Sequence, residues 1–138
     1  MVVMNPAQKS AMESLERAPF SALLGLKILS AENGVAEVRM PFSGKLLNDG
    51  GPSVPIHGGA IASLADFAAC AAIWSLEETQ RSATISMTVN YTGPGIQSDL
   101  LARATVRRHG KRVASINVEI RDRSDALVAD ALVTYKIA

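Results

Sequence analysis

A single carboxylate in an otherwise apolar segment is the first feature of this sequence that could do chemistry. The run "IHGGAIASLADFAACAA" spans residues 56–72, and Asp66 carries the only formal charge between Gly58 and Leu76. A buried carboxylate without partners costs several kcal/mol. One possibility is that Ser63 or a neighbouring strand forms hydrogen bonds with this carboxylate. The other is that the carboxylate acts as a nucleophile or a general base. The second interpretation is favoured, because buried acids on apolar helices are rare without a function.

The letters "HGG" at the start of this segment could supply the other half of a site. If Gly58 and Gly59 begin a helix, their N–H groups lack intrahelical acceptors, and without Cβ atoms a carbonyl oxygen can approach them closely. When a carbonyl group becomes tetrahedral, such donors stabilise it by about 3–4 kcal/mol. The alternative is a tight junction that needs glycine for steric reasons only, with His57 as a packed histidine instead of a base.

The spacing of these groups has a consequence for assembly. Asp66 follows Gly58 by eight residues, which is about 12 Å along a helix. One reacting carbon must lie about 3 Å from both the acid and the N–H donor. A single chain cannot arrange this, whereas two such helices packed antiparallel about a twofold axis can. We therefore expect a dimer with two equivalent shared sites.

The elements that must position these groups follow from the hydrophobic pattern. The sequence predicts a short helix capped by Ser10 with Glu13 in a capping box, then a helical turn that ends at Gly25. A hairpin over residues 26–42 turns at "ENG", and a loop leads to the apolar helix, which is predicted to run to about Glu78. Four alternating strand-like runs follow, over residues 82–92, 99–110, 111–125 and 126–138. This order predicts an α+β fold in which one curved antiparallel sheet wraps around one long central helix.

Length, charge and cysteine content restrict the class of protein. The chain has 138 residues and a net charge of +1, so we expect one domain over residues 1–138, with no nucleic-acid partner and no anionic membrane surface. Cys70 is the one cysteine, which excludes an internal disulfide and a cysteine-based metal cage, and we interpret it as a small buried apolar residue. Asp66 at the middle of the apolar run argues against a membrane span, and the first residues do not resemble a signal peptide. We expect a cytoplasmic protein.

Several motifs together resemble the hotdog-fold acyl-CoA thioesterases, and in particular their phenylacetic-acid-degradation branch. The motifs "HGGAIASLAD", "SATISMTVNYTGPG", "VRRHGKRVASINVEIRD" and "ALVADALVTY" occur in order, and the similarity covers nearly the whole chain. The resemblance implies that the chain hydrolyses an acyl thioester to a free acid and a thiol, without a metal or a redox cofactor. It also implies a catalytic site shared between two chains, commonly within a homotetramer that is a dimer of dimers.

The same resemblance implies roles for individual residues. His57 would hold the Gly58 region in position instead of accepting a proton. Thr84 lies where related enzymes place a Ser or Thr that orients the water or the acid, although threonine is also simply a good strand residue. These enzymes usually carry an Asn six residues before the His, but Gly51 occupies that position here, and Asn48 is the nearest candidate to replace it.

A cluster of cations in "RRHGKR" is a candidate binding site for the phosphates of CoA. Its members are Arg107, Arg108, Lys111 and Arg112. A cationic turn on a nearly neutral protein suits a ligand with several phosphates, whereas the alternative is a solvated hairpin turn. We interpret His109 and Gly110 as turn residues only.

Other functions remain compatible with this pattern. The main alternative is a non-hydrolytic acyl-CoA or acyl-lipid binding protein on the same scaffold, and a hydratase is a weaker third candidate. Acyl carrier protein could replace CoA as the carrier of the acyl group. The acyl group itself is left open, since Phe67, Trp74 and Met87 could line its pocket or belong to the core.

Overall fold

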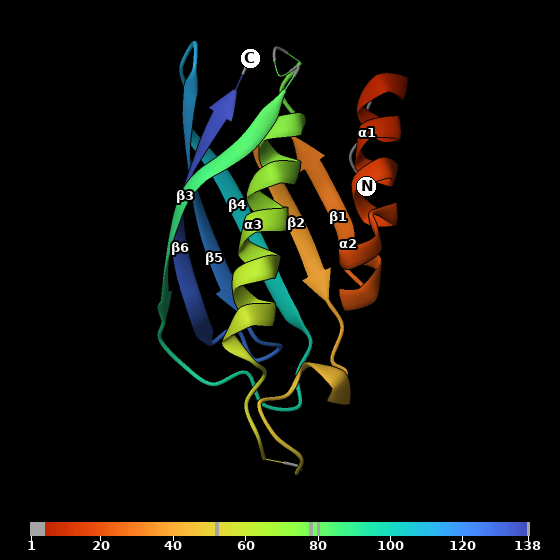
Figure 1. The fold of residues 1–138 in the computed structure, drawn as a ribbon, viewed down its shortest axis with the longest axis vertical. Coiled ribbons are helices and arrows are strands. Elements are labelled where there is room, and N and C mark those ends of the chain that lie inside the picture. Colours follow the sequence, from red (N-terminus) through yellow and green to blue (C-terminus); the bar gives the residue numbers. More distant parts are fainter. Residues whose placement is uncertain (1–4, 52, 78, 80, 138) are drawn as a thin grey trace.

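A curved antiparallel sheet packs against one long helix, as the sequence predicts (Figure 1). The computed structural model describes residues 5–51, 53–77, 79 and 81–137. The sheet has the order β1-β2-β4-β5-β6-β3. Its strands are β1 (Lys27–Glu32), β2 (Val35–Met40), β3 (Ser82–Tyr91), β4 (Leu100–His109), β5 (Val113–Arg121) and β6 (Leu127–Ile137). The predicted hotdog architecture is confirmed.

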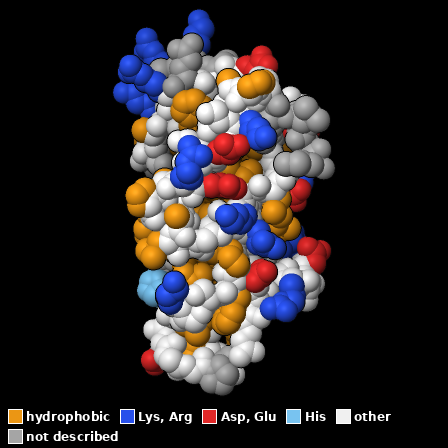
Figure 2. Space-filling view, turned by 90° about the vertical axis from the view of Figure 1, so that its right-hand side faces the viewer, with side chains coloured by type: hydrophobic (Ala, Val, Ile, Leu, Met, Phe, Trp, Pro, Cys, Tyr) orange, Lys and Arg blue, Asp and Glu red, His pale blue; other side chains and the backbone are white. Residues whose placement is uncertain are grey.

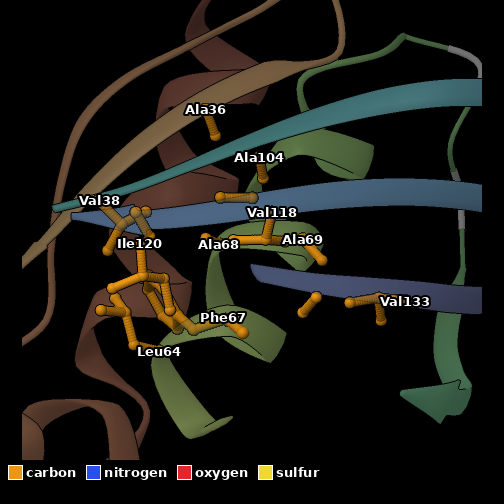
Figure 3. Packing of buried hydrophobic residues seen from close by; sticks show 14 of the residues in the cluster. Ala36, Val38, Leu64, Phe67, Ala68, Ala69, Ala104, Val118, Ile120 and Val133 are labelled. Atoms are coloured by element: carbon orange, nitrogen blue, oxygen red, sulfur yellow. The ribbon is translucent and has the colours of Figure 1, made fainter. Parts of the chain in front are cut away.

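The central helix α3 (Gly58–Trp74) is rich in alanine and lies close to the sheet. Leu64 and Ala68 are fully buried, and Figure 3 shows side chains of α3 facing those of Val118 and Ile120 on β5. The helix ends before the predicted Glu78 because Ser75 caps its last turn. The Ser75 hydroxyl donates a hydrogen bond to the main-chain oxygen of Ala72 at 2.6 Å. Small side chains on α3 thus allow the sheet to approach the helix closely.

The N-terminal helix α1 (Pro6–Arg17) begins earlier than predicted. Asn5, and not Ser10, is its N-cap: the Asn5 side chain accepts from the N–H of Gln8 at 2.8 Å. Proline at the first helical position explains this start, because its fixed φ suits a helix and its missing N–H would have had no partner there. The prediction of a capping box at Ser10 and Glu13 is therefore wrong.

The other turns follow the sequence closely. Helix α2 (Pro19–Leu24) ends at Gly25, which has φ of 71°. The β1–β2 hairpin turns at Asn33 and Gly34, both with positive φ, as expected for a two-residue turn of this composition. The predicted loop over residues 43–55 contains one short 3₁₀ helix, η1 (Gly44–Leu46).

The two edges of the sheet differ in how they are covered. At β1, the Glu16 side chain of α1 accepts from the Ile28 N–H at 2.6 Å. The opposite edge is β3, which pairs only with β6 within the described residues. Ile85 on this edge strand is 56% exposed. Another strand can pair with an open edge of this kind, which carries exposed apolar side chains, and so extend the sheet. Within the described part of the chain, no helix has the length and apolarity needed to cross a membrane.

Candidate active site

Asp66 lies in the middle of α3, and two strand residues hold its carboxylate. Oδ1 accepts from the Thr84 hydroxyl at 2.7 Å and lies 2.8 Å from the Tyr135 hydroxyl oxygen. The Tyr135 hydroxyl also lies 2.8 Å from the main-chain oxygen of Asp66. Ser63 does not contribute, because its hydroxyl donates to Gly59 O at 2.7 Å. Among the described residues nothing bonds to Oδ2, so this oxygen is left available for a ligand.

A β-bulge places Thr84 on the helix-facing side of the sheet. Side chains of a regular strand alternate between its two faces, so if Met87 faces the helix, Ile85 would also face the helix and Thr84 would face away from it. The register of β3 against β6 shifts between Thr84 and Ser86, so Ile85 is the extra residue and Thr84 pairs directly with Tyr135. Both hydroxyls consequently point at the same carboxylate oxygen. The bulge thereby re-aims a side chain, as bulges commonly do beside functional sites.

A cavity of about 310 Å³ lies beside the Asp66 carboxylate, and we call it the Asp66 cavity. Its larger apolar lining residues are Leu15, Phe20, Leu24, Leu26 and Phe67. Thr84, Tyr135 and Cys70 line its polar side. Asp66 is half-buried, which gives the carboxylate access to this cavity while the two strand hydroxyls fix its orientation. The arrangement can present a carboxylate oxygen to a substrate whose remainder is apolar.

Burial controls the two other ionisable groups of the cavity. Desolvation is the main reason why the pKa of the Tyr135 hydroxyl lies well above its ordinary value, so the hydroxyl keeps its proton and remains a donor to Asp66. Burial likewise raises the pKa of the Cys70 thiol from 9.0 to about 11. Cys70 is therefore a neutral thiol at physiological pH and no competing nucleophile. It is only half-buried, and it contributes to the cavity surface as well as to the core.

The start of α3 leaves one of the two predicted N–H donors unoccupied. His57 is exposed and caps the helix, with Nδ1 accepting from the Gly59 N–H at 2.8 Å. The Gly59 N–H thus already has a partner, whereas no acceptor within the described residues bonds to the Gly58 N–H. The Tyr91 hydroxyl donates to Gly58 O at 2.9 Å and ties this turn to β3. His57 and Tyr91 together fix the peptide group between Gly58 and Gly59, which directly follows the Gly58 N–H.

The loop before α3 carries Asn48 and Gly51. Asn48 is exposed, and its main-chain N–H donates to Pro55 O at 3.1 Å. Gly51 has φ of 131°, a conformation that favours glycine. The loop closes onto the helix start, since the His57 N–H donates to Leu46 O at 2.6 Å. Asn48 therefore lies in a segment that leads directly to Gly58.

The predicted cationic cluster lies at the β4–β5 turn. Arg107, Arg108, Lys111 and Arg112 are all exposed. No carboxylate of the described residues lies within 4 Å of these cations. Arg107 is at a second bulge, where the register shifts between Val106 and Arg108. The interpretation of His109 as a turn residue is wrong: it ends β4, is half-buried and lies 3.3 Å from the Thr79 hydroxyl.

Comparison with known proteins identifies the family. The model of the thioesterase superfamily matches residues 56–129, more than half of the chain. The chain belongs to the thioesterase superfamily. The predicted family and the predicted class of enzyme, a thioester hydrolase, are thereby confirmed.

Relatives of this thioesterase cover most of its length. It is 32% identical to the acyl-coenzyme A thioesterase PaaI of Escherichia coli, over 89% of this chain and 85% of that protein. It is 28% identical to the medium/long-chain acyl-CoA thioesterase YigI of Salmonella typhimurium, over 86% of this chain and 85% of that protein. The solved structure of E. coli PaaI superposes with a TM-score of 0.81 at 28% identity, over 96% of this chain and 93% of that chain.

Two site residues of this thioesterase escaped sequence reasoning. Tyr135 contacts the Asp66 carboxylate and Tyr91 bonds to Gly58 O, yet both occur in alternating strands where a tyrosine is unremarkable. They are the only tyrosines in the chain, and aromatic residues are few. That scarcity was the one signal in the sequence that could have drawn attention to them.

Proposed function

We propose that this thioesterase hydrolyses acyl-CoA to a free acid and CoA, with Asp66 as its nucleophile or general base. One observation carries this proposal: the Asp66 carboxylate is held at Oδ1 by Thr84 and Tyr135, while Oδ2 is available beside the Asp66 cavity. The names of the relatives PaaI and YigI support acyl-CoA as the substrate.

Either role of Asp66 gives a balanced reaction. As a base, Oδ2 takes a proton from water, the resulting hydroxide attacks the thioester carbon, and the carbon–sulfur bond breaks to release the CoA thiolate, which takes up the proton from Asp66. As a nucleophile, Oδ2 attacks the same carbon, and departure of the thiolate gives a mixed anhydride between Asp66 and the acyl group. Water then hydrolyses this anhydride to the free acid and protonated Asp66, whose proton passes to the thiolate. In both cases negative charge develops on the carbonyl oxygen, where an N–H donor stabilises it.

The Gly58 N–H of a second chain is the donor that we assign to this oxygen. Gly58 and Asp66 occupy the beginning and the middle of the same helix, about 12 Å apart along its axis, so they cannot serve one carbon within one chain. A twofold dimer with antiparallel α3 helices brings them together. The open edge of β3 supports this arrangement, because pairing of two β3 edges would extend the sheet across the dimer.

The remaining predicted residues take supporting roles in this proposal. His57 fixes the peptide group between Gly58 and Gly59, next to the Gly58 N–H, through its hydrogen bond to Gly59, and Asn48 contacts the substrate from the adjacent loop. The cations Arg107, Arg108, Lys111 and Arg112 bind the phosphates of CoA. No metal or other cofactor takes part.

A comparison of two carboxylate substitutions tests the role of Asp66. Asp66→Asn preserves an oxygen at the Oδ1 position, so the contacts with Thr84 and Tyr135 survive while the charge and basicity are lost. We expect thiol release from a panel of acyl-CoAs to fall at least about 100-fold. Asp130→Asn is the matched control, since Asp130 is also half-buried and hydrogen-bonded, by Asn90 at 3.0 Å, and it should retain wild-type activity.

Two results would contradict the proposal. Activity of Asp66→Asn within about threefold of wild type would remove Asp66 from the mechanism. Binding of acyl-CoA without any thiol release by the wild-type protein would favour the alternative, a non-hydrolytic acyl-CoA or acyl-lipid binding protein.

A further inference from the structure

A groove continues from the Asp66 cavity along α3, between this helix and α1. The next cavity, of about 380 Å³, shares Leu15, Cys70 and Ser82 with the Asp66 cavity. A third, of about 410 Å³, shares Ala11 and Trp74 with the second. We call these second and third cavities the α1 groove. Because neighbouring cavities share lining residues, they lie in a row from Asp66 towards the end of α3.

Helix α1 is fixed in place along this groove. Gln8 near its start donates to Ser75 O at 2.7 Å, and Glu16 in its last turn accepts from the Ile28 N–H. Between them, Met12 is buried in the core. Figure 1 shows α1 alongside β1 and the C-terminal half of α3. The groove therefore has one rigid side from α1 and another from α3.

The part of the α1 groove nearest to Asp66 suits an uncharged chain. Its lining consists of Ala11, Leu15, Cys70 and Trp74 with two serines. The Trp74 indole N–H is already satisfied by Ser82 Oγ at 2.8 Å. None of the described residues that line the groove is a lysine or an arginine, and the far end carries Glu77. A carboxylate there repels phosphates, so the groove does not fit the nucleotide of CoA.

The Asp66 cavity, from which the groove starts, also has an exposed apolar side chain in its lining. Figure 2 views the side of the molecule on which α1 and α2 lie, and it shows apolar side chains exposed between charged ones. Phe20, which lines the Asp66 cavity, is 60% exposed. An acyl chain that covers such side chains removes them from water, which favours binding.

We infer that the α1 groove holds the acyl chain of a straight-chain, medium-length substrate. The inference rests on the proposed function and adds the class of acyl group. Cys70 and Trp74 follow Asp66 by four and eight residues, hence by about 6 and 12 Å along α3. A carbon–carbon bond of about 1.5 Å advances an extended chain by roughly 1.3 Å. About five carbons therefore extend from Asp66 to Cys70, and an acyl chain of about ten carbons reaches Trp74.

Two identical substitutions on α1 test this assignment. Ser14 is exposed and lines the groove, whereas Ser10, one helical turn earlier, is also exposed but lines none of the described cavities. Because neither serine is buried, tryptophan at either position should leave the fold intact. We expect Ser14→Trp to lower the ratio of kcat/KM for decanoyl-CoA to that for butyryl-CoA at least about tenfold. Ser10→Trp should leave this ratio unchanged.

A binding measurement separates the inference from the proposed function. In the Asp66→Asn background, Ser14→Trp should weaken the binding of decanoyl-CoA at least about tenfold more than that of butyryl-CoA, whether or not the wild-type protein turns over. An equal loss of affinity for both ligands would indicate that the groove binds the CoA part of the substrate, which would overturn the inference. An unchanged ratio in both assays would also overturn it. Absence of turnover in the wild-type protein would contradict only the proposed function.

Discussion

Replacing Gly58 with proline would remove one backbone N–H group, which in the proposed site is the donor facing Asp66 of the other chain. The backbone accepts this change, because Gly58 is the first helical residue, where proline is favoured. His57 before it has φ of −58° and ψ of 134°, a conformation compatible with a following proline. The new Cβ would lie 3.3 Å from the Tyr91 ring, and this half-exposed ring can shift by a few tenths of an ångström.

The size of the effect follows from the missing donor. Loss of one oxyanion donor typically lowers kcat by about 10²–10³-fold, so Gly58→Pro alone should be nearly inactive. Gly58→Ala is the matched control, since it introduces the same contact with Tyr91 but keeps the N–H. Its activity should lie well above that of Gly58→Pro. If the two variants are equally inactive, steric hindrance and not the N–H group explains the loss.

Mixing of two inactive variants tests whether the site is shared. Refolding Gly58→Pro with Asp66→Asn at equal concentrations should give about half heterodimers by random pairing, each with one intact and one doubly defective site. Thiol release should recover to about a quarter of the wild-type rate. Confirmation of heterodimers by mass spectrometry without recovered activity would refute the shared site.

Three further predictions concern residues around this site. Tyr135→Phe should lower the free energy of unfolding in urea by about 1.5–3 kcal/mol, because it removes a buried donor to the charged Asp66; unchanged stability would mean that this hydrogen bond contributes nothing. Replacing Arg108 and Arg112 with alanine should raise KM for acyl-CoA without changing kcat. This increase in KM should become smaller as the salt concentration rises, and it should be absent with an N-acetylcysteamine thioester. An unchanged KM would show that the β4–β5 turn is merely solvated. Burial raises the pKa of the Cys70 thiol to about 11, so alkylation of this thiol at pH 8 should be about a hundredfold slower than alkylation of a thiol of pKa 9.0. The rate should increase as the pH rises towards 11. A rate equal to that of a small thiol would contradict the burial of Cys70.

The local sequence determined the parts of this protein that depend on short-range physics. The apolar run after "HGG" indicated a buried helix, since Asp66 at its middle argued against a membrane span, and the fixed rise of a helix set the separation of Gly58 and Asp66. "ENG" specified the first hairpin because Asn33 and Gly34 tolerate positive φ. Alternation in the later strands gave the antiparallel sheet. Local sequence misjudged the start of α1, where proline after Asn5 outweighed the cap expected at Ser10.

The partners of Asp66 were decided only by the tertiary structure. Tyr135 is 69 residues from Asp66 in the sequence, and it reaches the carboxylate because the sheet order places β6 beside β3. Thr84 faces the helix only because of the bulge at Ile85, which reverses the side that simple alternation assigns. Strand order and bulges arise from the packing of the whole sheet around α3, and no short stretch of sequence contains that information.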